Sequence, residues 1–411
     1  MSAPSDPHLP AQHGAPLAMP EFVSLVAALM ALGALGIDSM LPALPAIGKA
    51  LGVADANASQ FVVTAFFAGF GIGHLIHGPL ADRYGRRPVL IVALLVYALA
   101  NGLCAVATSF PLLLAARAFG GAAIAASRVA TVALVRDCFH GRAMARVMSI
   151  AYMVFMIVPV LAPAFGAGVL LFGGWRDIFW AVAVVSIAVL GWFAWRMPET
   201  LHAEDRLSLS VSRILAGWRV TVTERLSLGY TLATTALLGA LYGYLNSIQQ
   251  IMADTFGRPR LLVVIFATTA ATMAAANLFN AQLVMRVGTR RLGHGAVAVM
   301  IVASLVHLAF QASGYETLLT FAALQAVTLG CFGLATSNFS AMAMEEMGHI
   351  AGVASSVQGF ASICIAATIG ALIGQAFDGT AIPLTLGFLG AGVVALAIVA
   401  ATERGRLFRA A

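Results

Sequence analysis

The sequence is dominated by a series of apolar blocks, each about 20 residues or more in length, separated by short stretches that hold nearly all of the Arg, Asp and Glu. At a rise of about 1.5 Å per residue, each block is long enough to cross a hydrocarbon core about 30 Å thick. Only 10% of the residues are charged, against about 25% in ordinary soluble domains. Transmembrane strands would instead show alternating segments of about ten residues. The sequence therefore predicts an all-α membrane protein.

Twelve spans can be placed, in two groups of six. The first group is predicted at 21–47, 57–79, 88–108, 111–135, 145–172 and 178–196, and the second at 226–252, 260–285, 292–312, 315–342, 350–375 and 380–402. We expect a flexible cytoplasmic tail at 1–20, an N-terminal six-helix bundle at 21–196, a central cytoplasmic loop at 197–225, a C-terminal six-helix bundle at 226–402 and a cytoplasmic tail at 403–411.

The two groups look like a repeat. Arg83-Tyr84-Gly85-Arg86-Arg87 follows the second span, and Arg286-Val287-Gly288-Thr289-Arg290-Arg291 follows the eighth as a degraded echo. The same offset relates the starts of several spans in the two halves. Two parallel repeats joined by a charged loop are typical of secondary transporters.

Basic residues indicate the orientation in the membrane. With a cytoplasmic N-terminus, 17 of the 23 Lys plus Arg fall in cytoplasmic segments, as the positive-inside rule requires. Residues 1–20 hold no Lys or Arg, so the charged start of a signal peptide is missing. We expect a multi-pass protein of the bacterial inner membrane with both termini cytoplasmic.

Several function classes are disfavoured. The net charge of +6 resides in loops, so no nucleic-acid partner is expected. Lys49 is the only lysine, and without Gly-Lys-Ser/Thr no P-loop can form. The four cysteines are dispersed and indicate no disulfide, no metal site and no cofactor.

The sharpest motif runs from Gly78 to Leu90, with the sequence GPLADRYGRRPVL. It is expected to turn the chain tightly between two spans, and Gly85 permits the positive φ that such turns need. Arg136-Asp137 at the end of the fourth span is the expected partner at the same membrane face. The gating motif assigned here comprises Gly78, Asp82, Arg83, Gly85, Arg86, Arg87, Arg136 and Asp137. The segment resembles the loop signature of the major facilitator superfamily.

Further segments narrow the resemblance. They are Asp38-Ser39-Met40-Leu41-Pro42-Ala43-Leu44-Pro45, Arg117-Ala118-Phe119-Gly120-Gly121, Trp175-Arg176-Asp177-Ile178-Phe179-Trp180, Pro198-Glu199-Thr200-Leu201, Ser337-Asn338 and Ala351-Gly352-Val353-Ala354-Ser355-Ser356. Together they resemble the Bcr/CflA family of drug–proton antiporters over about residues 30–375. The resemblance implies twelve helices in two pseudo-symmetric bundles, alternating access and export coupled to proton entry. It also implies an antiporter motif at Pro159, Pro163 and Gly166, although Ala162 and Ala167 replace glycines of the usual signature.

Asp38 is the candidate for proton coupling, because an acidic residue deep in a span costs about 2.5–3.5 kcal/mol and usually has a function. Alternatively, its carboxyl caps a kink made by Pro42 and Pro45. Arg117 lies at a similar depth in the fourth span and is its expected partner. The family resemblance implies a role for Arg117 in proton transfer.

The cavity candidates are Arg128, Tyr242, Tyr244, Asn246 and Gln249. Arg128 follows Arg117 by eleven residues, which places both on one helix face, either as cavity wall or in helix packing. His74 and His77 are interpreted as interfacial residues, and Gly69 and Gly73 as a packing pair.

These features together predict a proton-coupled antiporter that exports small hydrophobic or cationic drug-like compounds. Its expected partners are the substrate, protons and the lipid bilayer, and the protein is expected to be monomeric. One alternative keeps the fold but carries a small metabolite such as a sugar or amino acid. Another is a membrane-embedded enzyme or receptor, but no paired catalytic residues or sensor domain support it.

Overall fold

A computed structural model describes residues 16–139, 141–206, 223–345 and 351–408, and these residues form helices and connecting turns without any strand. The long helices that precede the central loop are α1 (Met19–Asp38), α3 (Phe61–Tyr84), α4 (Arg86–Ala105), α5 (Phe110–Cys138), α6 (Gly141–Leu170) and α7 (Trp175–Arg196). Those that follow it are α9 (Arg225–Gln250), α10 (Leu262–Val287), α11 (Thr289–Ala312), α12 (Leu318–Ala343), α13 (Ala351–Gln375) and α14 (Ile382–Thr402).

Each predicted span corresponds to one of these helices. Ten helical segments are long and apolar enough to cross a membrane within the described residues. The helices α6 and α9 complete the set of twelve, and α9 carries the polar residues Asn246, Gln249 and Gln250 among apolar ones. Most of the predicted tail at 1–20, residues 207–222 of the central loop and residues 409–411 lie outside the described residues.

Two predicted helix ends were wrong. The first span is broken: α1 ends at Asp38, a 3-10 turn covers Leu41–Ala43, and a short helix, α2, covers Leu44–Ala50. Pro42 and Pro45 cause the break, since each removes a backbone donor at the start of a new helical turn. The second span continues as α3 through Pro79 to Tyr84, so most of the predicted loop motif is helical.

The turn between α3 and α4 is a single residue, Gly85, at φ +105°. An added Cβ there would also overlap the carboxylate of Glu199. Gly288 joins α10 to α11 in the same way, at φ +90°. The two halves therefore share this turn, as the repeat in the sequence predicts.

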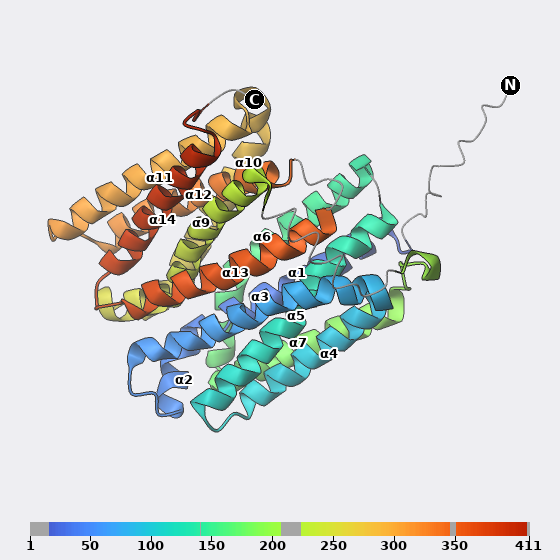
Figure 1. The fold of residues 1–411 in the computed structure, drawn as a ribbon. Helices are drawn as coiled ribbons and strands as arrows, with labels where there is room; N and C mark the ends of the chain where they lie inside the picture. Colours follow the sequence, from blue (N-terminus) through green and yellow to red (C-terminus); the bar gives the residue numbers. More distant parts are fainter. Residues whose placement is uncertain (1–15, 140, 207–222, 346–350, 409–411) are drawn as a thin grey trace.

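The helices pack as two groups, which we call the N half (α1–α7) and the C half (α9–α14). Within the N half, α5 packs against α3 and α4; within the C half, α9 packs against α13 and α14. The halves meet along α3 against α13, which lie side by side in the ribbon (Figure 1), and along α6 against α10. This pairing places two helices from each half at the seam of the molecule.

Small residues allow the close approach of α3 and α5. A Cβ added to Gly69 or Gly73 would overlap backbone carbonyl groups of α5, so the predicted packing pair is confirmed. Two buried serine hydroxyl groups donate to carbonyl groups of their own helices. Ser186 donates to the carbonyl of Val182 at 2.7 Å, and Ser304 to that of Met300 at 2.9 Å.

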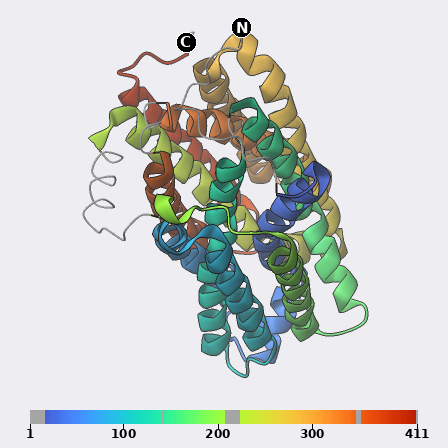
Figure 2. The ribbon, with the colours of Figure 1, turned by 90° about the vertical axis from the view of Figure 1, so that its right-hand side faces the viewer.

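The bundle has two different ends. We call the end where α1 begins and α14 ends the terminal end, and the opposite one the far end. A view turned by 90° shows both bundles extending between these ends (Figure 2). At the terminal end of the N half, Arg196 at the end of α7 pairs with Glu21 at the start of α1, at 2.6 Å. The α1–α3 and α13–α14 connections lie at the far end.

Candidate functional site

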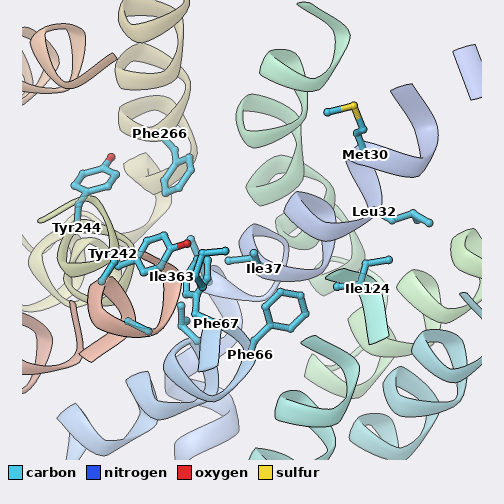
Figure 3. Close-up of a cluster of buried hydrophobic side chains, with 14 of the residues drawn as sticks. Met30, Leu32, Ile37, Phe66, Phe67, Ile124, Tyr242, Tyr244, Phe266 and Ile363 are labelled. Carbon is cyan, nitrogen blue, oxygen red and sulfur yellow. The ribbon is translucent and has the colours of Figure 1, made fainter. Parts of the chain in front are cut away.

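Apolar and aromatic side chains from both halves meet at the centre of the seam (Figure 3). Ile37 and Phe67 come from the N half, and Tyr242 and Ile363 come from the C half. The rings of Phe67 and Tyr242 stack with their centroids 3.7 Å apart. Phe66, Tyr244 and Phe266 extend the aromatic surface on either side. We call this group the central cluster.

Asp38 lies beside the central cluster, at the break that ends α1. Its exposed fraction is 5%. Within the described part of the chain, its carboxyl forms no hydrogen bond or ion pair, and the electrostatic neighbour it has across the seam is Tyr244. The alternative of a hydrogen-bonded carboxyl at a kink is therefore half right: the kink is present, but the carboxyl has no capping contact. An isolated buried carboxylate is costly unless it takes up a proton.

Arg117 is buried inside the N half, with 2% of its surface exposed. Its Nη1 donates to the carbonyl of Gly36 at 3.0 Å, and its Nε donates to that of Val62 at 3.2 Å. The guanidinium lies 4.4 Å from the Phe66 ring centroid. The predicted pairing with Asp38 was wrong. The two residues share a depth, but Arg117 reaches the α1 backbone two residues before Asp38 and not its carboxyl.

Arg128 occupies the same helix but a different environment. It is exposed, and its electrostatic neighbours are Tyr242 of the C half and His74 of α3. His74 donates from Nδ1 to the carbonyl of Phe70 at 2.9 Å and packs edge-on against that ring. His74 also abuts Gly359 of α13. Arg128 thus lies at the seam and not inside the N half.

The polar residues of α9 lie at helix contacts. Tyr244 hydrogen-bonds to Thr269 of α10 at 3.1 Å. Asn246 donates to the carbonyl of Tyr242 at 2.9 Å and accepts from Thr64 of the N half at 3.4 Å. Gln249 is buried, with 6% exposed. Of the predicted cavity candidates, Tyr242 and Asn246 therefore contact the opposite half directly.

The far end of the seam is closed by four amide side chains, which we call the far-end clasp: Asn57, Gln60, Gln250 and Gln375. Asn57 donates to the carbonyl of Phe377 at 2.9 Å, and Gln250 donates to Asn57 at 2.8 Å. Gln375 donates to the Asn57 carbonyl at 2.7 Å, and Gln60 hydrogen-bonds to Gln250. Each bond joins the N half to the C half.

The predicted gating motif lies at the terminal end of the N half. Arg86 pairs with Asp82 at 2.7 Å and with Asp137 at 3.0 Å, so α3, α4 and α5 are joined by one guanidinium. Arg87 donates from its side chain to the carbonyl of Ala194 at 2.7 Å, whereas Arg83 and Arg136 are exposed. Gly78 approaches Ser356 of α13 closely, since an added Cβ would lie 3.0 Å from its hydroxyl.

Glu199, a central-loop residue, was missed as a site residue. Its carboxylate accepts from the backbone N–H groups of Arg86 and Arg87, at 2.9 and 3.0 Å. An acidic group at the start of α4 satisfies free donors and complements the helix dipole. The Pro-Glu-Thr-Leu segment was recognised in the sequence, but its spacing from α4 gives no sign of this contact.

The C half carries a corresponding set of charges. Arg290 at the start of α11 pairs with Glu403 after α14 at 2.9 Å and with Glu345 after α12 at 3.5 Å. Tyr230 donates to Glu403 at 2.6 Å. Partial burial acts to raise the pKa of Glu403, but the hydrogen bonds from Tyr230 and Arg290 outweigh it, and the pKa lies below its ordinary value. Both halves thus tie a helix-start Arg to carboxylates at their terminal end.

The antiporter motif lies in α6, with Pro159 and Pro163 inside the helix. Gly166 faces α1: an added Cβ would overlap the carbonyl oxygen of Ser39, immediately after Asp38. Two residues on, Gly168 has nothing within 4 Å of an added Cβ. The motif therefore sets how closely α6 approaches the α1 break.

Metal and thiol chemistry have no support among the described residues. No group of three or more His, Cys, Asp or Glu side chains there could hold a metal ion. The four cysteines are free and are buried or half-buried at separate positions. The arrangement presents one isolated carboxyl, two arginines of different exposure and an aromatic surface between two halves.

The family model and the relatives found by comparison with known proteins agree on one family. The model of the Major Facilitator Superfamily matches residues 26–371. Among relatives, the chain is 29% identical to the MFS-type transporter YdgK of Bacillus subtilis, over 88% of this chain and 90% of the relative. It is 28% identical to a bicyclomycin resistance protein homologue of Haemophilus influenzae, over 91% of this chain and 93% of the relative.

A third relative is the multidrug resistance protein MdtL of Escherichia fergusonii, 29% identical over 84% of this chain and 86% of the relative. Among solved structures, the human organic anion transporter MFSD10 matches with a TM-score of 0.64 and 18% identity, covering 93% of this chain and 100% of that one. At this identity the likeness shows the fold. The resemblance to the Bcr/CflA group seen in the sequence is confirmed by the named relatives.

Proposed function

The chain belongs to the Major Facilitator Superfamily of membrane transporters, and from this premise we propose that it is a proton-coupled antiporter exporting small, largely hydrophobic drug-like molecules. It is a transporter and not an enzyme. Relatives named for bicyclomycin and multidrug resistance favour drug export over transport of a metabolite.

The proposal rests on one observation, the environment of the Asp38 side chain. Among the described residues this carboxyl has no hydrogen-bond or ion-pair partner, and it is buried at a helix break, next in sequence to Ile37 of the central cluster. A carboxylate in that position is costly as an anion and is stabilised by a proton or by a polar group of a bound substrate. Proton and substrate therefore compete for one site, which is the thermodynamic basis of antiport.

The contacts at the two ends of the seam provide a basis for alternating access, in which the site opens first to one side of the membrane and then to the other. Amide contacts of the far-end clasp join the halves at one end, and charge networks tie helices within each half at the other. With the terminal end in the cytoplasm of a bacterial inner membrane, as the basic residues favour, the clasp faces outward and closes the site from that side. Opening outward then requires the clasp to separate.

Proton entry supplies the energy in this scheme. Each 100 mV of membrane potential is worth about 2.3 kcal/mol per charge moved. That is roughly a 40-fold concentration ratio of substrate. A single protonation at Asp38 in each cycle is thus enough to maintain useful export.

Transport in everted membrane vesicles tests the proposal. Vesicles from a host lacking its own drug pumps should accumulate substrate when a proton gradient is imposed, and an uncoupler should abolish the accumulation. Vesicles without the chain are the control, and growth of the same host on a panel of compounds identifies the substrate. Uptake that continues unchanged with the gradient collapsed would contradict proton coupling, and transport in the opposite direction would contradict export.

A further inference from the structure

Arg128 is a charged residue of the interior that the proton cycle above does not use. It lies in α5, which spans Phe110–Cys138, about 6 Å from the helix midpoint toward the terminal end. A cation at this depth is costly when its side chain is in contact with lipid. Its exposure therefore needs a polar or water-accessible surrounding.

The neighbours of Arg128 show which way it faces. Tyr242 belongs to α9 of the C half, and His74 lies on the α3 surface that contacts Gly359 of α13. Both neighbours are at the seam between the halves. The exposed guanidinium thus faces the seam and not the surrounding lipid.

Depth distinguishes Arg128 from Asp38. Asp38 is the last residue of α1, about 29 Å along that helix from the terminal end. Arg128 is only about 15 Å along α5 from the same end. Since the far-end clasp closes the other side and Asp38 is buried, a molecule arriving from the terminal end reaches Arg128 first.

The surface beside Arg128 is aromatic. Tyr242 stacks on Phe67, and Phe70 packs against His74 with centroids 4.6 Å apart. Figure 3 shows Tyr242 and Phe67 at the centre of the cluster, next to Ile37 and Ile363. Phe67 and Tyr242 are buried where they stack across the seam, so their ring faces become available to a ligand when the halves separate. The Arg128 guanidinium adds a fixed group of hydrogen-bond donors at the edge of this aromatic contact.

The positive charge of Arg128 at the seam favours one chemical class of substrate. The guanidinium of Arg128 is a cation with several N–H donors and no acceptor. Its donors match oxygen acceptors such as nitro, carbonyl and phenolate groups. A lipophilic cation gains nothing from Arg128 and is repelled by it.

We propose that Arg128 is a specificity-determining residue, which binds an oxygen acceptor on aromatic substrates whose ring lies against Phe67 and Tyr242. This inference rests on the proposed transport function for its biological meaning. Binding at Arg128, however, requires neither a proton gradient nor a direction of transport. The substrates selected are neutral or anionic aromatic compounds, in preference to the lipophilic cations that the sequence also suggested.

Equilibrium binding to the purified transporter in lipid nanodiscs tests the inference without transport. The probes are radiolabelled chloramphenicol, which is neutral and carries nitro and amide oxygens, and tetraphenylphosphonium, an aromatic cation without an acceptor. The variant Arg128→Gln should weaken chloramphenicol binding about tenfold, the loss expected for one charge-assisted hydrogen bond. Tetraphenylphosphonium binding should stay equal or become tighter, and Arg128→Lys should be intermediate for chloramphenicol.

The matched control is Arg286→Gln, which removes one exposed positive charge at the end of α10 and should change neither affinity. Unchanged chloramphenicol binding in Arg128→Gln, or an equal loss of both ligands, overturns the inference. So does a wild type that binds only tetraphenylphosphonium, or neither ligand.

If Arg128→Gln does not fold, a competition experiment with the wild-type protein tests the same inference. A nitrobenzene derivative should displace chloramphenicol several-fold better than the same compound with methyl in place of nitro, and equal displacement overturns the inference. Loss of proton coupling in vesicles together with intact Arg128-dependent binding would contradict the proposed function while leaving this site in place.

Discussion

Gly166 is the residue where the α6 motif packs beside the proposed proton site. Its missing side chain lets α6 approach the carbonyl of Ser39, next to Asp38. Gly168, two residues on, lies on a different face of the helix and has nothing within 4 Å of an added Cβ. The sequence identified Gly166 through the family motif, but only the packing shows that the glycine serves the α1 break.

This pair gives a matched prediction. Gly166→Ala should push α1 and α6 apart, costing about 1–3 kcal/mol as in other overpacked cores, and should lower transport. The free energy of unfolding of Gly168→Ala should lie within about 0.5 kcal/mol of the wild-type value. Thermal unfolding in detergent and transport in vesicles measure both variants. Equal stability and equal transport of the two variants would show that the close approach of Gly166 to Ser39 is not required.

Arg117 shows how far depth alone can predict a contact. The count along two helices correctly put Arg117 level with the region of Asp38, because the helical rise is fixed. The direction of a long side chain depends on its neighbours, however. Phe66 and two backbone carbonyls hold the guanidinium inside the N half, so the ion pair does not form.

At the scale of elements, the α3–α4 turn concentrates the charges of the N half. Arg86 joins Asp82, Asp137 and, through its backbone, Glu199. The sequence predicted the turn and the role of Gly85 but placed the end of α3 too early. Pro79 and the charged residues suggested a loop, whereas α3 continues past Pro79 to Tyr84, and Asp82 in this extension pairs with Arg86.

Removing one of these charges should change the conformational balance more than the folding. Asp82→Asn loses the pair with Arg86, while Asp137 keeps its own. Because half-exposed ion pairs contribute only about 0.2–1 kcal/mol, the unfolding temperature should change little. The labelling rate of Ser356→Cys, beside Gly78, should change several-fold, and transport should fall.

Asp254→Asn, which removes an exposed carboxylate at the far end, is the control for that experiment. Unchanged transport together with unchanged labelling in Asp82→Asn would rule out a gating role for this carboxylate.

The corresponding network of the C half predicts a pH dependence. The folded-state pKa of Glu403 lies below its ordinary value, because the hydrogen bonds from Tyr230 and Arg290 outweigh the effect of partial burial. The stabilisation is therefore fully present above the ordinary Glu pKa of about 4.3 and is lost as the pH falls through the lower folded-state pKa. The difference in melting temperature between the wild type and Glu403→Gln should shrink below about pH 4.3. A difference that stays constant from pH 7 to pH 3 would contradict this role.

At the scale of the whole molecule, the twelve helices could be predicted because each is a continuous apolar block. The far-end clasp could not. It joins Asn57 to Gln250 and Gln375, which are 193 and 318 residues away in the chain, and isolated amides have no periodicity that marks them. The pairing of halves thus depends on tertiary contacts that a single sequence does not display.

We expect the far-end clasp to open in each transport cycle. In a background with the four native cysteines replaced by alanine, Gln60→Cys with Gln250→Cys places two thiols where the amides hydrogen-bond across the seam. Oxidative cross-linking should stop transport, and a reducing agent should restore it, while each single variant should be insensitive to oxidation. Full transport by completely cross-linked protein would exclude alternation at this end.

The central claim is that Asp38 carries the proton which the substrate displaces. It is tested most directly by proton release from the purified, weakly buffered protein near pH 7 when substrate is added. The wild type should release up to one proton per bound substrate, whereas Asp38→Asn, which keeps the size of the group but cannot titrate, should release none. Undiminished release by a folded Asp38→Asn variant would contradict the account and move the coupling site to another group, such as His74, His77 or Glu345.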